Sequence, residues 1–506
     1  MLNHRTVRIL LIFFFLFTAQ TSIAGKVFDF NAVCKQAYNE ITRLKLNAGQ
    51  RLIDQEKKKN PDNLIPYFLE NYIDFFILFY TEDPAEYKKR INNLDNRLEL
   101  MNQGPTNSPF FLFSKSVIHF QWAAVKIKFS KTWDAGWEFR RSYLQVKENL
   151  KKFPSFSPNL LFNGSMQVTV GTIPDGYKWL TNLFGMRGDI MTGMKHLEDF
   201  LGKTDEWSML FHDECIFYYL YLKFYVQNDQ KGVFEFIENN NLDIRDNHLF
   251  AFLATNLRLN GQQAAEAERI ILSRNPSTEY FYLPIWDLEL GYAKLSRLDS
   301  GSVIYFEKFL KDFKGKFYVK DALQKISWYY YIHGDQQKAN QYRKEILEKG
   351  NLETEADQQA QKEAKSDRWP QKILLQARLL NDGGYYMEAL RILYGKKHTD
   401  FALVEDKLEF TYRVGRLYDD VDRDDEAIDF YKQAIYFGEK RREHFASRAA
   451  LQIGFIFEKR KDYQTAINWF KRCIDMKDHE FKNSLDQRAK AGISRCEQSA
   501  NLSSNE

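Results

Sequence analysis

Few stretches of this chain bring together residue types that could do chemistry. The row His212-Asp213-Glu214-Cys215 offers ligand atoms for a metal, and Gly202-Lys203-Thr204 ends like a phosphate-binding loop. Successive residues of a helix point about 100° apart, so the row cannot converge on one ion. A phosphate loop would also need a glycine where Leu197 stands. Because the chain has no H-x-x-x-H, C-x-x-C or G-x-S-x-G pattern, we expect no catalytic residue, cofactor or metal, and predict that the protein is not an enzyme.

Other suggestive runs also have structural interpretations. Arg187-Gly188-Asp189 spells an integrin-type tripeptide, but a glycine turn followed by an aspartate is typical of a helix start, where the carboxylate accepts backbone N–H bonds. The paired carboxylates Asp419-Asp420 and Asp424-Asp425 flank a turn, and we expect them to be solvated and helix-capping. These runs therefore predict no reactive site.

A phrase that recurs near the C-terminus indicates binding in place of catalysis. Val414–Tyr418 followed by Asp424–Tyr431 is answered by Ile453–Phe457 followed by Asp462–Phe470. In both copies a Gly is followed three residues on by an aromatic, nine further by an Ala, and four after that by another aromatic. This spacing resembles the tetratricopeptide repeat, a helix–turn–helix unit of about 34 residues. Small residues recur where two helices cross closely, and the large ones fill the groove beside the crossing.

Weaker copies of this phrase precede the two clear ones, around the following residues: Trp286, Ser302 and Phe306; Tyr330 and Ala339; Leu380, Ala389 and Leu393. No stretch shows sustained strand alternation, whereas long stretches place apolar residues at helical spacing. The sequence therefore predicts an all-α fold, a tetratricopeptide-like solenoid of helical hairpins that winds into an α–α superhelix.

The expected organisation has a divergent helical repeat region over residues 25–350, which starts with one long helix over 30–58. Proline and glycine crowd residues 153–188, so we expect an irregular insert there. Residues 366–497 are expected to hold the C-terminal tetratricopeptide repeats and a capping helix, and 498–506 a disordered tail.

The first helix of each hairpin lines the concave face of such a solenoid, and its residues between the consensus positions face the groove. The predicted partner-binding groove mixes aromatic and arginine side chains, the types enriched at binding hot spots. Its members are Trp328, Tyr331, Arg378, Asn381, Glu409, Tyr412, Arg416, Arg448 and Phe455.

The N-terminus predicts export. Arg5 and Arg8 precede the apolar run from Ile9 to Phe17, and Ser22-Ile23-Ala24 offers small residues for cleavage after Ala24. We thus predict a signal peptide over residues 1–24 and no transmembrane span in the mature chain. The periplasm or cell envelope is the expected location, with secretion as the alternative.

Composition limits the partners and the redox chemistry. With 72 Lys and Arg against 68 Asp and Glu, the net charge is +4, so no strong field favours nucleic acid. Four cysteines in 506 residues form no disulfide framework. We expect Cys34, Cys215, Cys473 and Cys496 to be buried free thiols.

The middle of the chain has a signature of its own. It consists of Phe162-Asn163-Gly164-Ser165, Gly171-Thr172-Ile173-Pro174, Gly185-Met186-Arg187-Gly188-Asp189 and Gly193-Met194-Lys195-His196-Leu197. In this order the segments resemble the inclusion-body-clearance and tetratricopeptide-repeat-protein-39 family, and the likeness runs over about residues 150–350. This chain has Met186 where the family has an aromatic, and it carries an export signal. The resemblance implies an all-helical fold and assigns no activity.

Two functions remain open from the sequence. One is an exported scaffold that binds a protein or peptide in its concave groove. The other is a cell-envelope protein that binds a small ligand such as a glycan, with aromatic rings as stacking platforms.

Overall fold

The computed structural model describes residues 25–173 and 185–503, and nearly all of its regular structure is helical. The N-terminal helices are α2 (Ala32–Thr42), α3 (Leu46–Lys59), α4 (Ile65–Thr81), α5 (Pro84–Arg90), α6 (Asn93–Asn102), α7 (Pro109–Lys128), α8 (Thr132–Lys152), α9 (Pro158–Gly171), α11 (Ile190–Leu201), α12 (Glu206–Leu210), α13 (His212–Tyr225), α14 (Gln230–Asn239) and α15 (His248–Asn260). In these described ranges the β structure is limited to an isolated parallel bridge between Val27 and Asn63.

The second half continues with further helices. They are α16 (Ala264–Ser273), α17 (Ile285–Ser296), α18 (Ser302–Asp312), α19 (Val319–Ile332), α20 (Gln336–Glu348), α21 (Glu355–Lys365), α22 (Lys372–Asp382), α23 (Tyr386–Leu393), the 3-10 turn η2 (His398–Asp400), α24 (Val404–Asp420), α25 (Asp424–Gly438), α26 (Phe445–Lys459), α27 (Tyr463–Asp475) and α28 (Lys482–Ser503). Consecutive helices pack as hairpins, for example α7 with α8 and α24 with α25.

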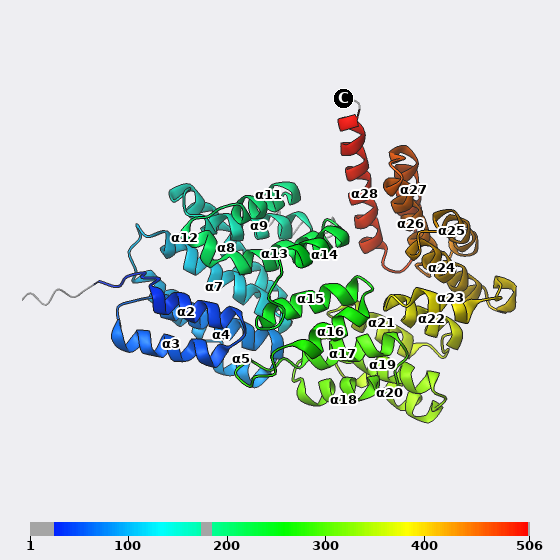
Figure 1. The fold of residues 1–506 in the computed structure, drawn as a ribbon, viewed down its shortest axis with the longest axis horizontal. Coiled ribbons are helices and arrows are strands. Elements are labelled where there is room, and N and C mark those ends of the chain that lie inside the picture. The colour runs from blue at the N-terminus through cyan, green and yellow to red at the C-terminus, as the bar shows by residue number, and fades with distance from the viewer. Residues whose placement is uncertain (1–24, 174–184, 504–506) are drawn as a thin grey trace, which may run out of the picture.

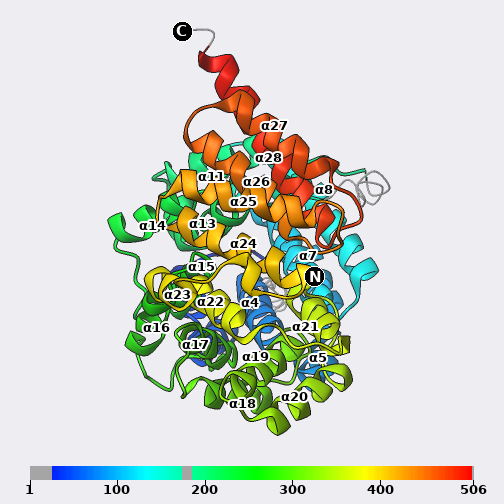
Figure 2. The ribbon, with the colours of Figure 1, turned by 90° about the vertical axis from the view of Figure 1, so that its right-hand side faces the viewer.

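The hairpins follow a curved path. In Figure 1 the blue and cyan N-terminal helices lie at the left, the green helices α15 to α18 descend from the middle to the bottom, and the orange and red helices rise at the right. In Figure 2, turned by 90°, the orange helices α24 to α27 lie in front of the N-terminal ones. The predicted all-α solenoid of helical hairpins is therefore confirmed.

The consensus glycines lie where the spacing predicts them. A methyl group on Gly415 would come within 2.8 Å of the Tyr431 ring, and one on Gly454 within 2.5 Å of the Phe470 ring. A methyl group on Gly291, in the weaker repeat, would come within 2.8 Å of Phe306. In each hairpin the second helix therefore presses an aromatic ring against a bare backbone in the first.

The expected single helix over 30–58 is wrong, because α2 and α3 fold back on each other as a hairpin. Leu44 adopts the left-handed conformation at φ 66° and is fully buried. Its carbonyl oxygen accepts a hydrogen bond from the Phe281 amide. Tertiary contacts thus hold a turn that has neither glycine nor proline at its centre.

Part of the expected irregular insert is also helical. Residues 158–171 form α9, which packs against α11. A methyl group on Gly164 would lie 2.8 Å from the Gly193 carbonyl oxygen, and one on Gly193 2.7 Å from the Gly164 carbonyl oxygen. These glycines, interpreted as helix breakers, instead allow two helices to cross closely. Residues 174–184, which include Pro174 of the signature, lie outside the described residues.

The capping helix is longer than expected. We predicted a disordered tail from 498, but α28 continues to Ser503. No proline or glycine follows Gly492, and Ala, Gln and Glu favour helix, so nothing in the sequence stops it earlier. The other domain boundaries, among them the signal peptide over 1–24, stay predictions.

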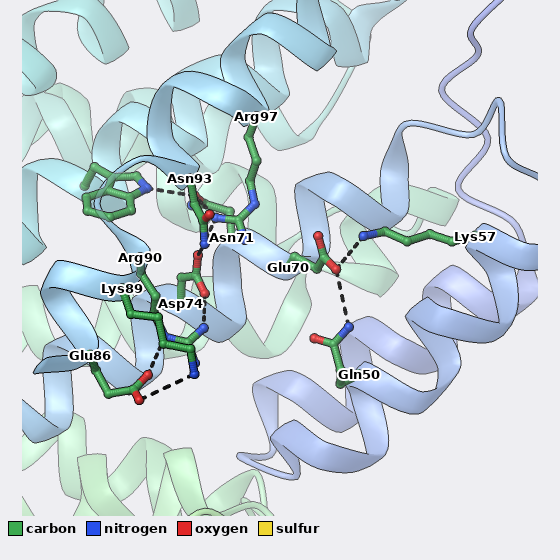
Figure 3. A network of polar contacts seen from close by, with 11 residues as sticks. Gln50, Lys57, Glu70, Asn71, Asp74, Glu86, Lys89, Arg90, Asn93 and Arg97 are labelled. Carbon is green, nitrogen blue, oxygen red and sulfur yellow. Dashed lines mark hydrogen bonds and ion pairs between the residues drawn. The ribbon is translucent and has the colours of Figure 1, made fainter.

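Charged side chains are buried inside the N-terminal half. Asp74 on α4 pairs with Arg90, lies 2.5 Å from a guanidinium nitrogen of Arg97 and accepts a hydrogen bond of 2.8 Å from Asn93 (Figure 3). Buried charges destabilise a fold unless they are paired, and here the paired residues lie on three different helices. The network therefore ties α4 to α5 and α6.

Two further sequence expectations concern the whole chain. All four cysteines are buried and free, so the expectation of unpaired core thiols is confirmed. Across the helices that the structure describes, none has the length and apolar character needed to cross a membrane.

Candidate functional site

A groove of about 1310 Å³ runs along the first helices of the C-terminal hairpins. Side chains from α22, α24 and α26 form its floor. Residues of α21, of α28 and of the turns after α13 and α15 form its walls. The groove is thus the concave face of the C-terminal repeats, enclosed further by segments far away in the sequence.

Seven of the nine predicted groove residues line this cavity. They are Arg378, Asn381, Glu409, Tyr412, Arg416, Arg448 and Phe455. The spacing rule that selected them therefore finds one face, although their role in binding stays a prediction.

Trp328 and Tyr331 lie elsewhere, because the chain folds over the face of α19. The Trp328 indole is 1% exposed and donates a 2.5 Å hydrogen bond to Glu363 of α21. Tyr331 stacks on Trp369 at a centroid distance of 4.5 Å and donates to the Pro370 carbonyl oxygen. The polar segment from α21 to Pro370 therefore covers the face of α19 on which these rings would have faced a ligand.

Asp357 explains why α21 docks there. Its buried carboxylate accepts hydrogen bonds from the backbone amides of Tyr318 at 2.8 Å and Asp321 at 3.1 Å, in the first turn of α19. The carboxylate satisfies amides that a helix start leaves without partners. One buried acid in a polar helix therefore holds α21 in place.

Arg416 is part of a structural network. Its guanidinium lies 2.9 Å from the Asp420 carboxylate and 3.6 Å from that of Asp419. Asp420 also accepts hydrogen bonds from Asn381 at 2.7 Å and from Gln262, in the turn after α15, at 3.2 Å. The expectation that Asp419 and Asp420 are solvated is wrong, since Asp420 joins α22 and α24 to the middle of the chain, and Asp419 accepts hydrogen bonds from Tyr431 and Gln452.

Most other arginines of the groove also have acidic partners. Arg413 lies 2.8 Å from Glu409, and Arg495 donates to Glu458 at 2.7 Å. Arg378 lies 3.5 Å from Asp382. Each of these guanidinium groups is held by a carboxylate of the protein itself.

Arg448 and Arg488 differ from these. Among the described residues, no carboxylate oxygen lies within 4.0 Å of either guanidinium. Arg488 lies over the ring of Phe455, 5.5 Å from its centroid. Burial, together with the positive charge of Arg448, lowers the pKa of Arg488 to about 10.

The side chain of His444 lies near the same positive charges. Burial lowers its pKa well below the ordinary value of 6.5, and Arg448, Arg413 and Arg378 lower it further. Glu480, 3.3 Å from the His444 ring, does not offset them. This part of the groove therefore combines partial burial with the neighbouring positive charges of Arg448 and Arg488.

The aromatic members are less exposed than the spacing suggested. Tyr412 is only 4% exposed and packs between Tyr431 and Phe445 at centroid distances of 6.0 and 5.2 Å. Phe455 is half-buried and lies edge-on to Phe470 at 5.3 Å. Phe455 consequently offers the groove more apolar surface than Tyr412 does.

Sequence reasoning missed Arg488, because it lies on the closing helix outside the repeat pattern. A signal was available, since Arg488 and Arg495 are seven residues apart and so share a face of α28. Both line the groove.

One family model agrees with the hairpin repeats of the C-terminal part. The family model of the tetratricopeptide repeat matches residues 408–437 and 447–479. No curated protein matches the chain significantly. Among solved structures, the chain is similar to the tetratricopeptide-repeat domain of P58(IPK), with 12% identity over 83% of this chain and 97% of that one and a TM-score of 0.23.

A second similar structure comes from the APC/C hetero-tetramer Cut9–Hcn1. The identity is 10%, the match covers 92% of this chain and 99% of that one, and the TM-score is 0.28. Its identity, like that of the first structure, is too low to say anything about function. The two C-terminal hairpins that the recurring phrase predicted are tetratricopeptide repeats.

Proposed function

We propose that this protein is a non-catalytic scaffold that holds a segment of a protein partner in the groove of its C-terminal repeats. The observation that carries the proposal is the groove itself, which is lined by side chains from three successive hairpins and has two arginines, Arg448 and Arg488, without a carboxylate within 4.0 Å in the described part of the chain. Solenoids of this kind use their concave face for binding. Arginine and aromatic side chains are the usual anchors of protein interfaces.

The glycan alternative has less support from the geometry. Carbohydrate stacking needs an open ring face, whereas Trp328 and Tyr412 are 1% and 4% exposed. Phe455 remains as a half-buried ring. A protein segment, which can use the polar and charged lining as well, therefore suits this groove better.

We also propose that the protein acts after export, in the periplasm or cell envelope. This proposal rests on the basic and apolar N-terminal sequence, which lies outside the described residues. Fractionation and N-terminal sequencing test it: a mature chain that begins at Gly25 supports export, and an intact N-terminus in the cytosolic fraction contradicts it.

Kinship with the inclusion-body-clearance and tetratricopeptide-repeat-protein-39 family is likewise a proposal. Two glycines of the signature, Gly164 and Gly193, lie at the close crossing of α9 and α11. A shared crossing of this kind would explain why the signature resembles that family.

Photocrosslinking in the native cell tests the scaffold proposal. A benzoylphenylalanine replaces Ser484, which lines the groove. The matched control places it at Tyr436, which is 81% exposed and does not line the groove. We expect a defined protein adduct from position 484 and none from position 436; adducts at 436 alone, or the same adducts at both, contradict groove binding.

A further inference from the structure

We infer that the partner segment is acidic and that one of its aspartate or glutamate side chains lies between Arg448 and Arg488. This inference rests on the proposed function and names the chemistry that the groove recognises.

The two arginines come from neighbouring helices. Arg448 is on α26 and Arg488 on α28, and these two helices pack directly against each other. Both side chains line the groove. Two like charges held together in a partly buried place repel each other, and an anion placed between them would relieve that repulsion.

The contrast with neighbouring arginines shows what is missing. Arg413, Arg416 and Arg495 have carboxylates at 2.8, 2.9 and 2.7 Å. Arg448 and Arg488 have none within 4.0 Å in the described chain. A carboxylate from outside would complete the same pairing, with the paired N–H···O bonds that guanidinium groups form with carboxylates.

The surroundings favour a carboxylate over the other anions. Glu409, Asp420 and Glu458 also line the groove, so a phosphate with a charge of about −1.5 to −2 would meet more repulsion than a single carboxylate. A neutral sugar would leave the two arginines uncompensated. Phe455, which lies under Arg488, offers apolar surface to a residue beside the acidic one. The favoured occupant is thus an extended protein segment in which acidic and apolar residues alternate.

Fluorescence anisotropy with the full chain tests this. The probes are a labelled peptide of alternating Glu and Tyr, the same peptide with Gln for Glu, and a third with phosphoserine for Glu. We expect the Glu peptide to bind about tenfold more tightly than the Gln peptide, a difference of about 1.4 kcal/mol, because hydrogen bonds to charged groups are stronger than those between neutral groups. The phosphoserine peptide should not exceed the Glu peptide.

Substitutions of the two arginines test whether the Glu peptide binds at this place in the groove. Arg448→Gln and Arg488→Gln should each weaken binding of the Glu peptide about tenfold. The matched control is Arg442→Gln, which removes the same charge from an exposed side chain that does not line this groove, and binding should stay within about twofold. Arg448→Lys and Arg488→Lys, which keep the charge, serve if a glutamine variant fails to fold, and should weaken binding by less than tenfold.

Several outcomes would overturn the inference. They are equal binding, or no binding, of the Glu and Gln peptides; equal weakening by Arg442→Gln; and tighter binding of the phosphoserine peptide. If the peptides fail to discriminate while crosslinking at position 484 persists, the scaffold function stands and only the acidic partner is wrong. If that crosslinking is also lost, the groove function fails as well.

Discussion

Helices of the N-terminal half pack through rings, whereas those of the C-terminal repeats pack through alanines. Phe30 alone has four aromatic neighbours, Tyr38, Phe110, Trp207 and Phe211, at centroid distances of 5.8 to 6.2 Å. The core of α24 to α28 instead has fully buried alanines: Ala427, Ala434, Ala449, Ala450, Ala466 and Ala489. Each C-terminal hairpin adds one large ring against a glycine.

This difference explains which repeats can be recognised. A close crossing at Gly or Ala tolerates only one residue size, so the pattern recurs with each hairpin. A cluster of rings can fill space at many angles, so its members need not recur at a fixed spacing. The two regions therefore share hairpin packing while only one of them shows the repeat in its sequence.

The two regions also differ in how their charged side chains are paired. The N-terminal half buries Asp74 in a network of ion pairs, while the C-terminal groove holds two half-buried arginines with no carboxylate within 4.0 Å among the described residues. We interpret the first arrangement as stabilising and the second as binding. Four substitutions test these differences in charge and in packing, in order of decreasing expected effect.

The largest effect is expected from Asp74→Ala. Removing this carboxylate leaves the largely buried Arg97 without its acidic partner, which should lower the free energy of unfolding by about 3–5 kcal/mol. Chemical denaturation followed by circular dichroism measures it. The control Asp54→Ala, on the exposed face of α3, should change stability by less than about 0.5 kcal/mol. Equal effects would show that the network is not stabilising.

The next effect is expected from Glu214, a buried acid that has no cationic side chain within 4.0 Å among the described residues. Burial raises the pKa of Glu214 from 4.5 to about 7, and its carboxylate accepts hydrogen bonds from Tyr38 at 2.7 Å and Tyr72 at 3.1 Å. The folded chain then keeps a proton that the unfolded chain releases above pH 4.5. The free energy of unfolding is therefore highest below about pH 4.5, where Glu214 is protonated in both states, and it falls as the pH rises towards 7.

Glu214→Gln, neutral at every pH, should remove this dependence. The variant should match the wild type near pH 4.5 and exceed it at pH 8 by up to about 3 kcal/mol, since each pKa unit is worth about 1.4 kcal/mol. Denaturation at both pH values checks this, with the exposed Asp54→Asn as control. A constant difference between the pH values would contradict the raised pKa.

In the C-terminal repeats, Gly454→Ala tests the close crossing. The added methyl would lie 2.5 Å from the Phe470 ring, and such overpacking lowers stability by about 1–3 kcal/mol. Gly202→Ala is the matched control, because its methyl would meet only the carbonyl oxygens of Glu198 at 3.6 Å and Asp199 at 3.8 Å, and Gly202 has an ordinary φ of −79°. Gly202→Ala should therefore be neutral or slightly stabilising; equal losses in the two variants would show that the Phe470 contact is unimportant.

Particular residues show how far the sequence predicts this molecule. The consensus spacing locates Gly415 and Gly454 against their rings and places seven groove residues on one face, because both depend on local helix geometry. It cannot predict that Leu44 turns the chain, since that turn depends on a contact with Phe281. Nor can it predict the burial of Trp328, which is set by the docking of α21 through Asp357.

The smallest effect on stability is expected from Arg488→Gln. This arginine has no carboxylate within 4.0 Å in the described chain, and Arg448 and Arg416 add repulsion to the desolvation of its charge. Its removal should change the free energy of unfolding by less than about 0.5 kcal/mol, or raise it slightly. Arg416→Gln, which leaves Asp420 without its ion pair, should cost about 1 kcal/mol or more. A loss from Arg488→Gln as large as that from Arg416→Gln would mean that Arg488 stabilises the fold, and would remove the reason to assign it to a partner.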